Sequence, residues 1–176
     1  MAHYLMLRYP SANRVYAGEA QTLSEAELEL TCPFAENYHT TDVAGVGYLG
    51  FESPQLTSHE LSLLAAQSTA FALFEARDSL LQPLQLPVTD ILDDDLITIP
   101  KYQGKTNEQF TRLLMNVTLA AITRRQDGPR QVLDPMAGRG TTLSTALLMG
   151  HEAYGVEADA KAFEQMSAFY TTWLRR

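Results

Sequence analysis

Two periods of apolar residues run along this chain of 176 residues, one typical of strands and one of helices. Strand patterns cover residues 3–9, 15–16, 46–51, 96–99, 132–133 and 151–156. Helical spacing covers residues 25–30, 58–77, 107–125, 141–149 and 159–173. Residues 10–13 have turn chemistry, residues 34–45 are expected to form a loop, and residues 80–95 are expected to form a connector. The pattern predicts a small α+β module over 1–95 and an α/β unit over 96–176.

The α/β unit centres on a glycine turn between two apolar strands. Asp134-Pro135 ends the strand at 132–133, because proline cannot donate to a sheet ladder. Gly138 and Gly140 then allow a tight turn in which the main chain can approach a ligand without a Cβ in the way. Glu157 follows the next strand. The order strand, turn, helix, strand and acid indicates half of a nucleotide-binding unit, with its crevice at the carboxyl ends of the strands.

Three kinds of ligand use such a unit. A phosphate-binding loop needs a lysine after the second glycine, but Gly140 is followed by Thr141 and Thr142, which are good helix N-caps. A dinucleotide site needs a third glycine where this chain has Leu143, which disfavours a nicotinamide oxidoreductase but leaves it as an alternative. The remaining ligand bears adenosine and no pyrophosphate. Glu157 is then placed to accept hydrogen bonds from both ribose hydroxyls.

Two stretches, Asp134–Thr142 and Gly155-Val-Glu157-Ala-Asp159, resemble the cofactor motifs of class I S-adenosylmethionine-dependent methyltransferases, chiefly of the branch that modifies RNA or DNA bases. The resemblance implies S-adenosylmethionine as the cofactor. It implies that 96–176 is the N-terminal half of a doubly wound, Rossmann-like methyltransferase sheet, with the α+β module at 1–95 before it. The expected cofactor residues are Asp134, Pro135, Met136, Ala137, Gly138, Gly140, Thr141, Glu157, Ala158 and Asp159.

A second resemblance precedes the cofactor strand. Gly104-Lys105-Thr106-Asn107 is similar to a segment of RNA guanine-N2 methyltransferases that carry an RNA-binding domain of the THUMP kind. It adds Thr106 to the expected cofactor residues and favours RNA, either tRNA or rRNA, over DNA as the substrate.

No catalytic residue is assigned. Related base methylases carry a loop of the form [D/N/S]-P-P-[Y/F/W], and this chain has no Pro-Pro pair. The chain is therefore expected to be the N-terminal part of a longer methyltransferase, and a permuted order ranks second. Half a parallel sheet leaves an open edge and an uncovered apolar face, so self-association or a second polypeptide completing the sheet is expected. The alternative is a non-catalytic fragment or module that binds a partner through that edge.

Charge and composition limit the kinds of ligand, partner and cellular location that are expected for the chain. The formal net charge is −8; residues 1–98 hold three basic and fourteen acidic residues, and residues 99–176 hold ten and seven. Only the second part would tolerate a polyanion. One cysteine, Cys32, and four histidines without ligand spacing argue against a metal site. No membrane span or signal peptide is evident, so a cytoplasmic location without a membrane partner is expected. The residues of a weak nucleic-acid face, or else merely solvated charges, are Lys101, Lys105, Arg112, Arg124, Arg125, Arg130 and Arg139.

Overall fold

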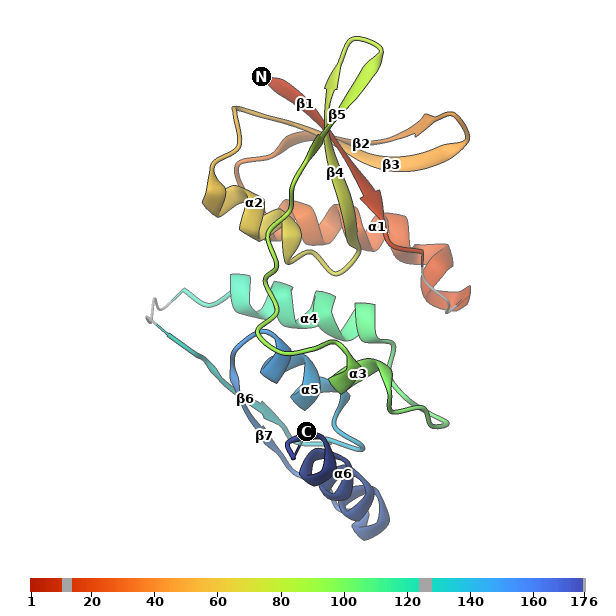
Figure 1. Ribbon diagram of the computed structural model, residues 1–176, viewed down its shortest axis with the longest axis vertical. Helices are drawn as coiled ribbons and strands as arrows, with labels where there is room; N and C mark the ends of the chain where they lie inside the picture. The colour runs from red at the N-terminus through yellow and green to blue at the C-terminus, as the bar shows by residue number, and fades with distance from the viewer. Residues whose placement is uncertain (11–13, 124–127, 176) are drawn as a thin grey trace. The chain divides into compact units, whose positions relative to one another are not determined.

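The computed structural model describes residues 1–10, 14–123 and 128–175 (Figure 1). The chain divides into two compact units, Met1–Thr89 with Asn116–Ile122, and Asp90–Met115 with Thr123–Arg176. It is a mixed α/β protein, but its main sheet has five antiparallel strands, so a Rossmann-like sheet is not what dominates the fold. The only parallel pairing in the described residues is that of two short strands, β6 and β7. The elements are β1 Ala2–Arg8, α1 Arg14–Thr31, β2 Glu36–Val43, β3 Val46–Ser53, α2 Ser58–Ala65, β4 Ala70–Arg77, β5 Leu80–Leu84, α3 Asp95–Thr98, α4 Glu108–Ala120, β6 Gln131–Asp134, α5 Thr141–Leu148, β7 Glu152–Gly155 and α6 Ala160–Trp173.

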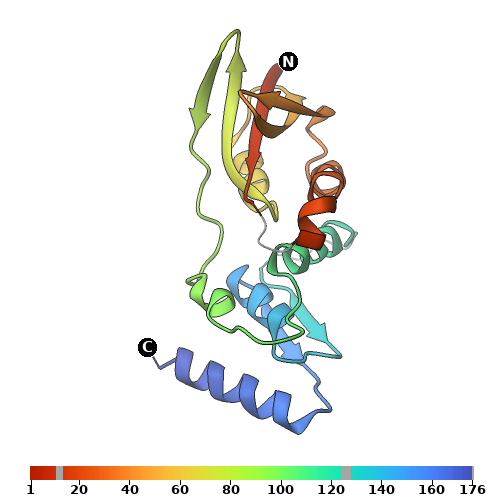
Figure 2. The same ribbon diagram turned by 90° about the vertical axis from the view of Figure 1, so that its right-hand side faces the viewer.

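The antiparallel sheet has the strand order β2-β3-β1-β4-β5. Its core lies between one sheet face and the helices α1 and α2 (Figure 2). Met6 and Phe51 from the sheet pack there with Leu28 of α1 and Leu64 of α2, and all four are at most 1% exposed. Burial of this apolar surface is the main stabilising contribution to the unit.

A buried carboxylate ties three segments of this unit together. Glu27, 1% exposed, accepts hydrogen bonds from the main chain and hydroxyl of Ser68 and, at 2.7 Å, from the amide of Asn116. Asn116 also donates to the carbonyl of Ala66 at 2.8 Å. Because a buried polar group is costly unless it is hydrogen-bonded, this network fixes the turn between α2 and β4 against α1.

The helix predicted at 25–30 and the strand predicted at 15–16 are wrong in extent and type, since one helix, α1, covers both. Ser24 lies inside this helix, where its hydroxyl donates to the Ala20 carbonyl at 2.6 Å and pairs with Thr69 at 2.9 Å. Of the turn predicted at 10–13, residues 11–13 lie outside the described residues.

The loop predicted at 34–45 is also wrong, because it contains the strand β2. Its polar residues do not alternate with apolar ones, since β2 is an edge strand that is exposed along most of its length. The strand β2 forms because it pairs with β3 through a tight hairpin. Ala44 and Gly45 in that hairpin have φ of 54° and 82°, the positive values that a two-residue hairpin of type I′ requires.

The helix predicted at 58–77 is only half correct. It ends at Ala65, and the strand β4 begins at Ala70 and pairs with β1. Thr57 is the N-cap, with Glu60 completing a capping box. The connector predicted at 80–95 includes the strand β5, and the strand predicted at 96–99 is instead the short helix α3, whose Leu96 and Ile97 are buried.

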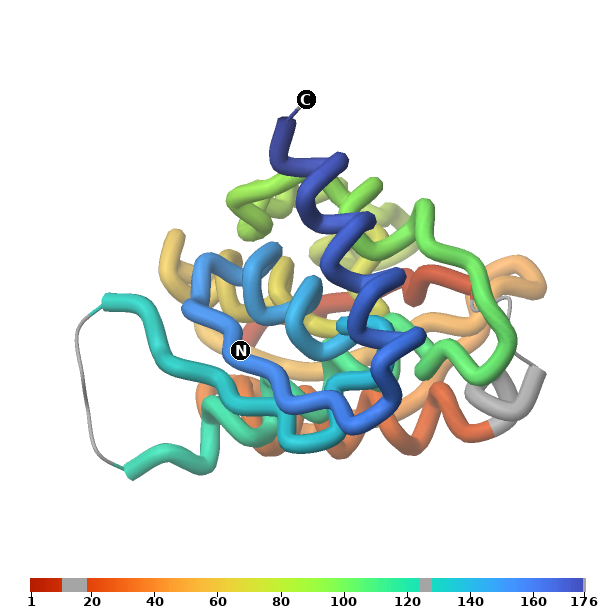
Figure 3. Tube along the Cα trace, turned by 90° about the horizontal axis from the view of Figure 1, so that it is seen from below, coloured from red at the N-terminus to blue at the C-terminus, as the bar shows by residue number. Residues whose placement is uncertain are grey.

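The second unit contains β6, α5, β7 and α6, as predicted, preceded by α3 and the first part of α4. Figure 3 shows α6 crossing α5, and the aromatic residues Phe169, Tyr170 and Trp173 of α6 pack on Leu148 of α5. The helix predicted at 107–125 is α4, which ends at Ala120. None of the helices in the described ranges is long and apolar enough to cross a bilayer.

Cys32 provides a chemical probe of the folded N-terminal unit. Its side chain is fully buried, and burial raises the pKa of the thiol to about 11. Near pH 8 the reactive thiolate is therefore about two orders of magnitude scarcer than in the unfolded chain. An aromatic disulfide reagent should modify the native protein about 100-fold more slowly than the protein in concentrated urea. Equal rates in the two solutions would contradict the burial of this thiol.

Candidate ligand-binding site

The two strands of the second unit run parallel and are joined by α5. Val132 pairs with Ala153, and Leu133 pairs with Tyr154. Because the strands are parallel, the segments that follow them leave the same edge of the sheet. These segments are the glycine turn after β6 and the acidic segment 157–159 after β7, so two of the predicted motifs lie side by side.

Main-chain hydrogen bonds hold the turn onto the end of β7. Val156 donates to the carbonyl of Asp134, and Ala137 donates to the carbonyl of Val156, both at 2.9 Å. The Asp134 carboxylate accepts from the amide of Met136 at 2.9 Å, which closes the first bend after the strand. The turn is therefore a fixed part of the sheet edge.

The two glycines of the turn have different roles. Gly140 has φ of 87°, and an added Cβ would lie 2.6 Å from the Tyr170 hydroxyl and 2.9 Å from the Met166 sulfur. Gly140 is thus required for close packing against α6. Gly138 has φ of 56°, and an added Cβ would meet no atom within 4 Å. Its outer side is open, so a ligand can approach the main chain there.

Glu157 lies beside the turn, as the sequence predicted, and both its carboxylate oxygens are engaged. One accepts from the amide of Gly138 at 2.6 Å, and the other accepts from the amide of Asp159 at 2.7 Å. Asp159 in turn caps α6 by accepting from the amides of Lys161 and Ala162. The carboxylate of Glu157 therefore joins the glycine turn to the start of α6.

The predicted cap of α5 is wrong. The N-cap residue is Gly140, in the left-handed conformation and without a side-chain hydrogen bond, rather than Thr141 or Thr142. Thr141 is 7% exposed, and its hydroxyl pairs with the phenol of Tyr102 at 3.0 Å. This contact brings the segment before α4 to the beginning of α5.

A pocket of about 370 Å³ lies against the turn. The predicted residues that line it are Thr106, Asp134, Met136, Ala137, Gly138 and Thr141. The predicted residues outside its lining are Pro135, Gly140, Glu157, Ala158 and Asp159. The residues that sequence reasoning did not name as cofactor-binding are Tyr102, Gln103, Gly104, Arg139, Thr142 and Ala162. The signal for Arg139 was its place between the two glycines, and the signal for Tyr102 was its place in the loop before Thr106.

The pocket combines opposite charges with hydroxyl groups. Asp134 supplies a carboxylate, and Arg139 supplies a guanidinium whose carbon lies 4.5 Å from the centre of the Tyr102 ring. Behind the turn, burial raises the pKa of Tyr170, which donates to the carbonyl of Gly140 at 3.0 Å. Among the described residues, no group of three or more His, Cys, Asp or Glu side chains could hold a metal ion.

The basic residues of the predicted nucleic-acid face are not equivalent. Lys105 pairs with Glu108 and with the carbonyl of Ile97, and Arg112 forms a two-pronged ion pair with Asp90. These two cations are used within the unit. Arg124 and Arg125 lie outside the described residues.

Gly155 tests the packing that supports the site. An added Cβ there would lie 2.7 Å from Leu143 Cδ1 and 2.9 Å from the Cβ of Ala137. Gly155→Ala should therefore destabilise the second unit by about 1–3 kcal/mol, as overpacking does. Urea unfolding followed by the fluorescence of Trp173, the one tryptophan of the chain, reports on this unit.

Gly47→Ala is the matched control, because its added Cβ would meet only an Arg8 nitrogen, at 3.8 Å. It should leave the Trp173 transition unchanged. If Gly155→Ala unfolded at the same urea concentration as the wild-type protein, Leu143 and the turn would not pack on β7 as described.

Comparison with known proteins assigns the chain to no family. No protein-family model matches the chain. No curated protein matches it either.

Proposed function

We propose that this chain binds S-adenosylmethionine at the glycine turn and serves the methylation of a nucleic-acid base, with RNA favoured over DNA. The observation that carries the proposal is the hydrogen bond from Gly138 to Glu157, at the carboxyl edge of a parallel strand–helix–strand unit. This is the edge at which open α/β sheets bind nucleotides. We also propose that this unit is the N-terminal half of a doubly wound, Rossmann-like methyltransferase sheet.

The state of Glu157 supports a ribose site. Each carboxylate oxygen accepts one main-chain hydrogen bond and keeps further lone-pair capacity. The two main-chain bonds hold the carboxylate in one orientation, so a ribose diol would meet a preorganised pair of acceptors. Gly138, whose amide donates to Glu157, has open space where a Cβ would stand.

The pocket beside the turn suits the amino-acid end of the methyl donor. That end carries an ammonium and a carboxylate. The pocket presents Asp134 and Arg139, one group of each charge, together with the hydroxyls of Thr106 and Thr142. A zwitterion could therefore be bound without leaving an unpaired charge in the pocket.

The exposed apolar face of β6 and β7 supports the proposal that the active form includes a partner polypeptide. Leu133 and Tyr154 are paired across the strands and are 65% and 52% exposed, and Val156 is 57% exposed. Parallel strands are normally covered on both faces, so this apolar surface favours self-association or a second polypeptide that completes the sheet. Catalytic residues stay unassigned under either arrangement.

Calorimetric titration with S-adenosylhomocysteine, the stable product of the cofactor, tests the proposal. The wild-type chain should bind it, and Glu157→Ala should weaken binding by about 1–3 kcal/mol, because the ribose loses its acceptor. Glu164→Ala is the control, since Glu164 is an exposed acid of α6 that belongs neither to the expected ribose site nor to the pocket at the glycine turn.

NADH titrated in parallel decides between cofactors. Binding of NADH with no binding of S-adenosylhomocysteine would replace the proposal with a nicotinamide oxidoreductase. Unchanged affinity in Glu157→Ala would remove this carboxylate from the site.

A further inference from the structure

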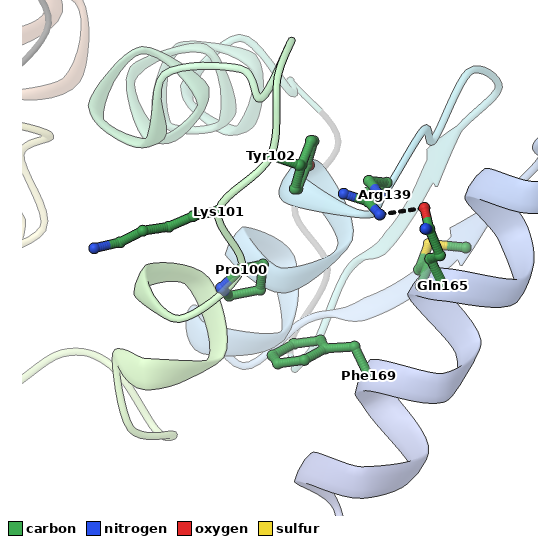
Figure 4. A pocket seen from close by; sticks show the side chains of 7 residues that line it. Pro100, Lys101, Tyr102, Arg139, Gln165 and Phe169 are labelled. Atoms are coloured by element: carbon green, nitrogen blue, oxygen red, sulfur yellow. Dashed lines mark hydrogen bonds between the residues drawn. The ribbon is translucent and has the colours of Figure 1, made fainter.

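A second pocket, of about 190 Å³, lies in the same unit beside the first. The residues that line it are Pro100, Lys101, Tyr102, Arg139, Gln165, Met166 and Phe169. Figure 4 shows this pocket from close by. It shares only Tyr102 and Arg139 with the pocket at the glycine turn. None of its residues belongs to the cofactor set predicted from sequence.

The walls of this pocket are flat and largely apolar. The ring of Phe169 reaches toward Pro100 on one side, and Tyr102 lies on the other beside Arg139 (Figure 4). Gln165 and Phe169 are four residues apart on α6, so they lie on the same side of that helix. The rings offer stacking surfaces, and stacking does not depend on the identity of a planar ligand.

Two polar side chains, Arg139 and Gln165, lie together at one end of the pocket (Figure 4). Arg139 stacks on the Tyr102 ring and donates to the amide oxygen of Gln165. That hydrogen bond orients the amide and leaves the NH2 group of Gln165 able to donate elsewhere. A planar heteroaromatic ring with acceptors along its edge fits these walls and donors, and nucleobases have this chemistry.

We propose that this pocket receives an unpaired base of a single-stranded nucleic acid. The choice of RNA as that strand rests on the proposed function, whereas the choice of a nucleobase rests on the residues of the pocket. Lys101 supports a strand over a free base, because its side chain is exposed and extends away from Arg139, where a backbone phosphate can reach it (Figure 4).

The adenine of the cofactor is the competing source of a base. Glu157, Ala158 and Asp159 line neither this pocket nor the one at the glycine turn. A ribose held by Glu157 is therefore outside the pocket of Phe169. The cofactor and the strand would occupy different pockets that meet at Tyr102 and Arg139.

Fluorescence anisotropy with a labelled single-stranded RNA of about ten nucleotides tests the inference. Phe169→Leu keeps apolar bulk against the core but removes the stacking ring, and it should weaken RNA binding about tenfold. Phe163→Leu is the matched control: Phe163 lies on the same helix, is 53% exposed and is not part of the pocket. It should bind RNA as the wild-type chain does.

Two further measurements distinguish a nucleic-acid strand from a free nucleoside, and this inference from the proposed function. Phe169→Leu should leave S-adenosylhomocysteine binding unchanged in calorimetry. Free adenosine at the concentration of the RNA should not displace it, because adenosine lacks the backbone phosphates that Lys101 can reach. Loss of RNA affinity in Phe169→Leu with no cofactor binding in any variant would leave this inference standing and overturn the proposed function.

Three results would overturn the inference. These are absence of RNA binding by the wild-type chain, equal RNA affinity of wild type and Phe169→Leu, and displacement of the RNA by an equal concentration of adenosine. The last result would assign the pocket to a free nucleoside.

Discussion

The carboxylate of Glu157 and the amide of Gly138 make the contact on which the candidate site depends. Parallel pairing of β6 with β7 brings the two segments to one edge, and three hydrogen bonds then join the turn to the end of β7. Because Gly155 has no side chain, Leu143 and Ala137 can pack against β7. Because Gly140 has none, Tyr170 and Met166 of α6 can pack against the turn. Main-chain register, glycine placement and one acid therefore position the glycine turn and the carboxylate that a ligand would meet at this edge.

This contact gives Glu157 two roles that a sequence pattern cannot separate. In a ribose site the acid is a ligand-binding group, and in the free protein it is a hydrogen-bond acceptor for the turn and for the start of α6. The two roles support each other, because a carboxylate already fixed by main-chain donors loses little freedom when it binds a diol. Any loss of affinity in a variant of Glu157 thus combines a lost acceptor with a less rigid turn.

Local signals explain which parts of the fold could be predicted. The apolar run at 132–133, the Asp134-Pro135 stop and the glycines specify β6 and the turn over a few residues, and the spacing after Asp159 specifies α6. The N-terminal unit was harder, because β2 is a strand only through its hairpin pairing with β3, and β4 is a strand only through pairing with distant β1 and with β5. Residues 70–77 contain alanine, leucine and phenylalanine that also suit a helix, so tertiary pairing decided the outcome. The pocket of Phe169 was missed for the same reason, since it forms where α6 meets residues 100–102.

The most direct test of the account is the amide spectrum of a chain labelled with ¹⁵N-glycine, recorded as S-adenosylhomocysteine is added. The account predicts that the signals of Gly138 and Gly140 move in a saturable way, while those of Gly45 and Gly47, in the antiparallel unit, stay in place. Signals of Gly138 and Gly140 that stay unchanged at a high concentration of this ligand would contradict the glycine turn as its binding site.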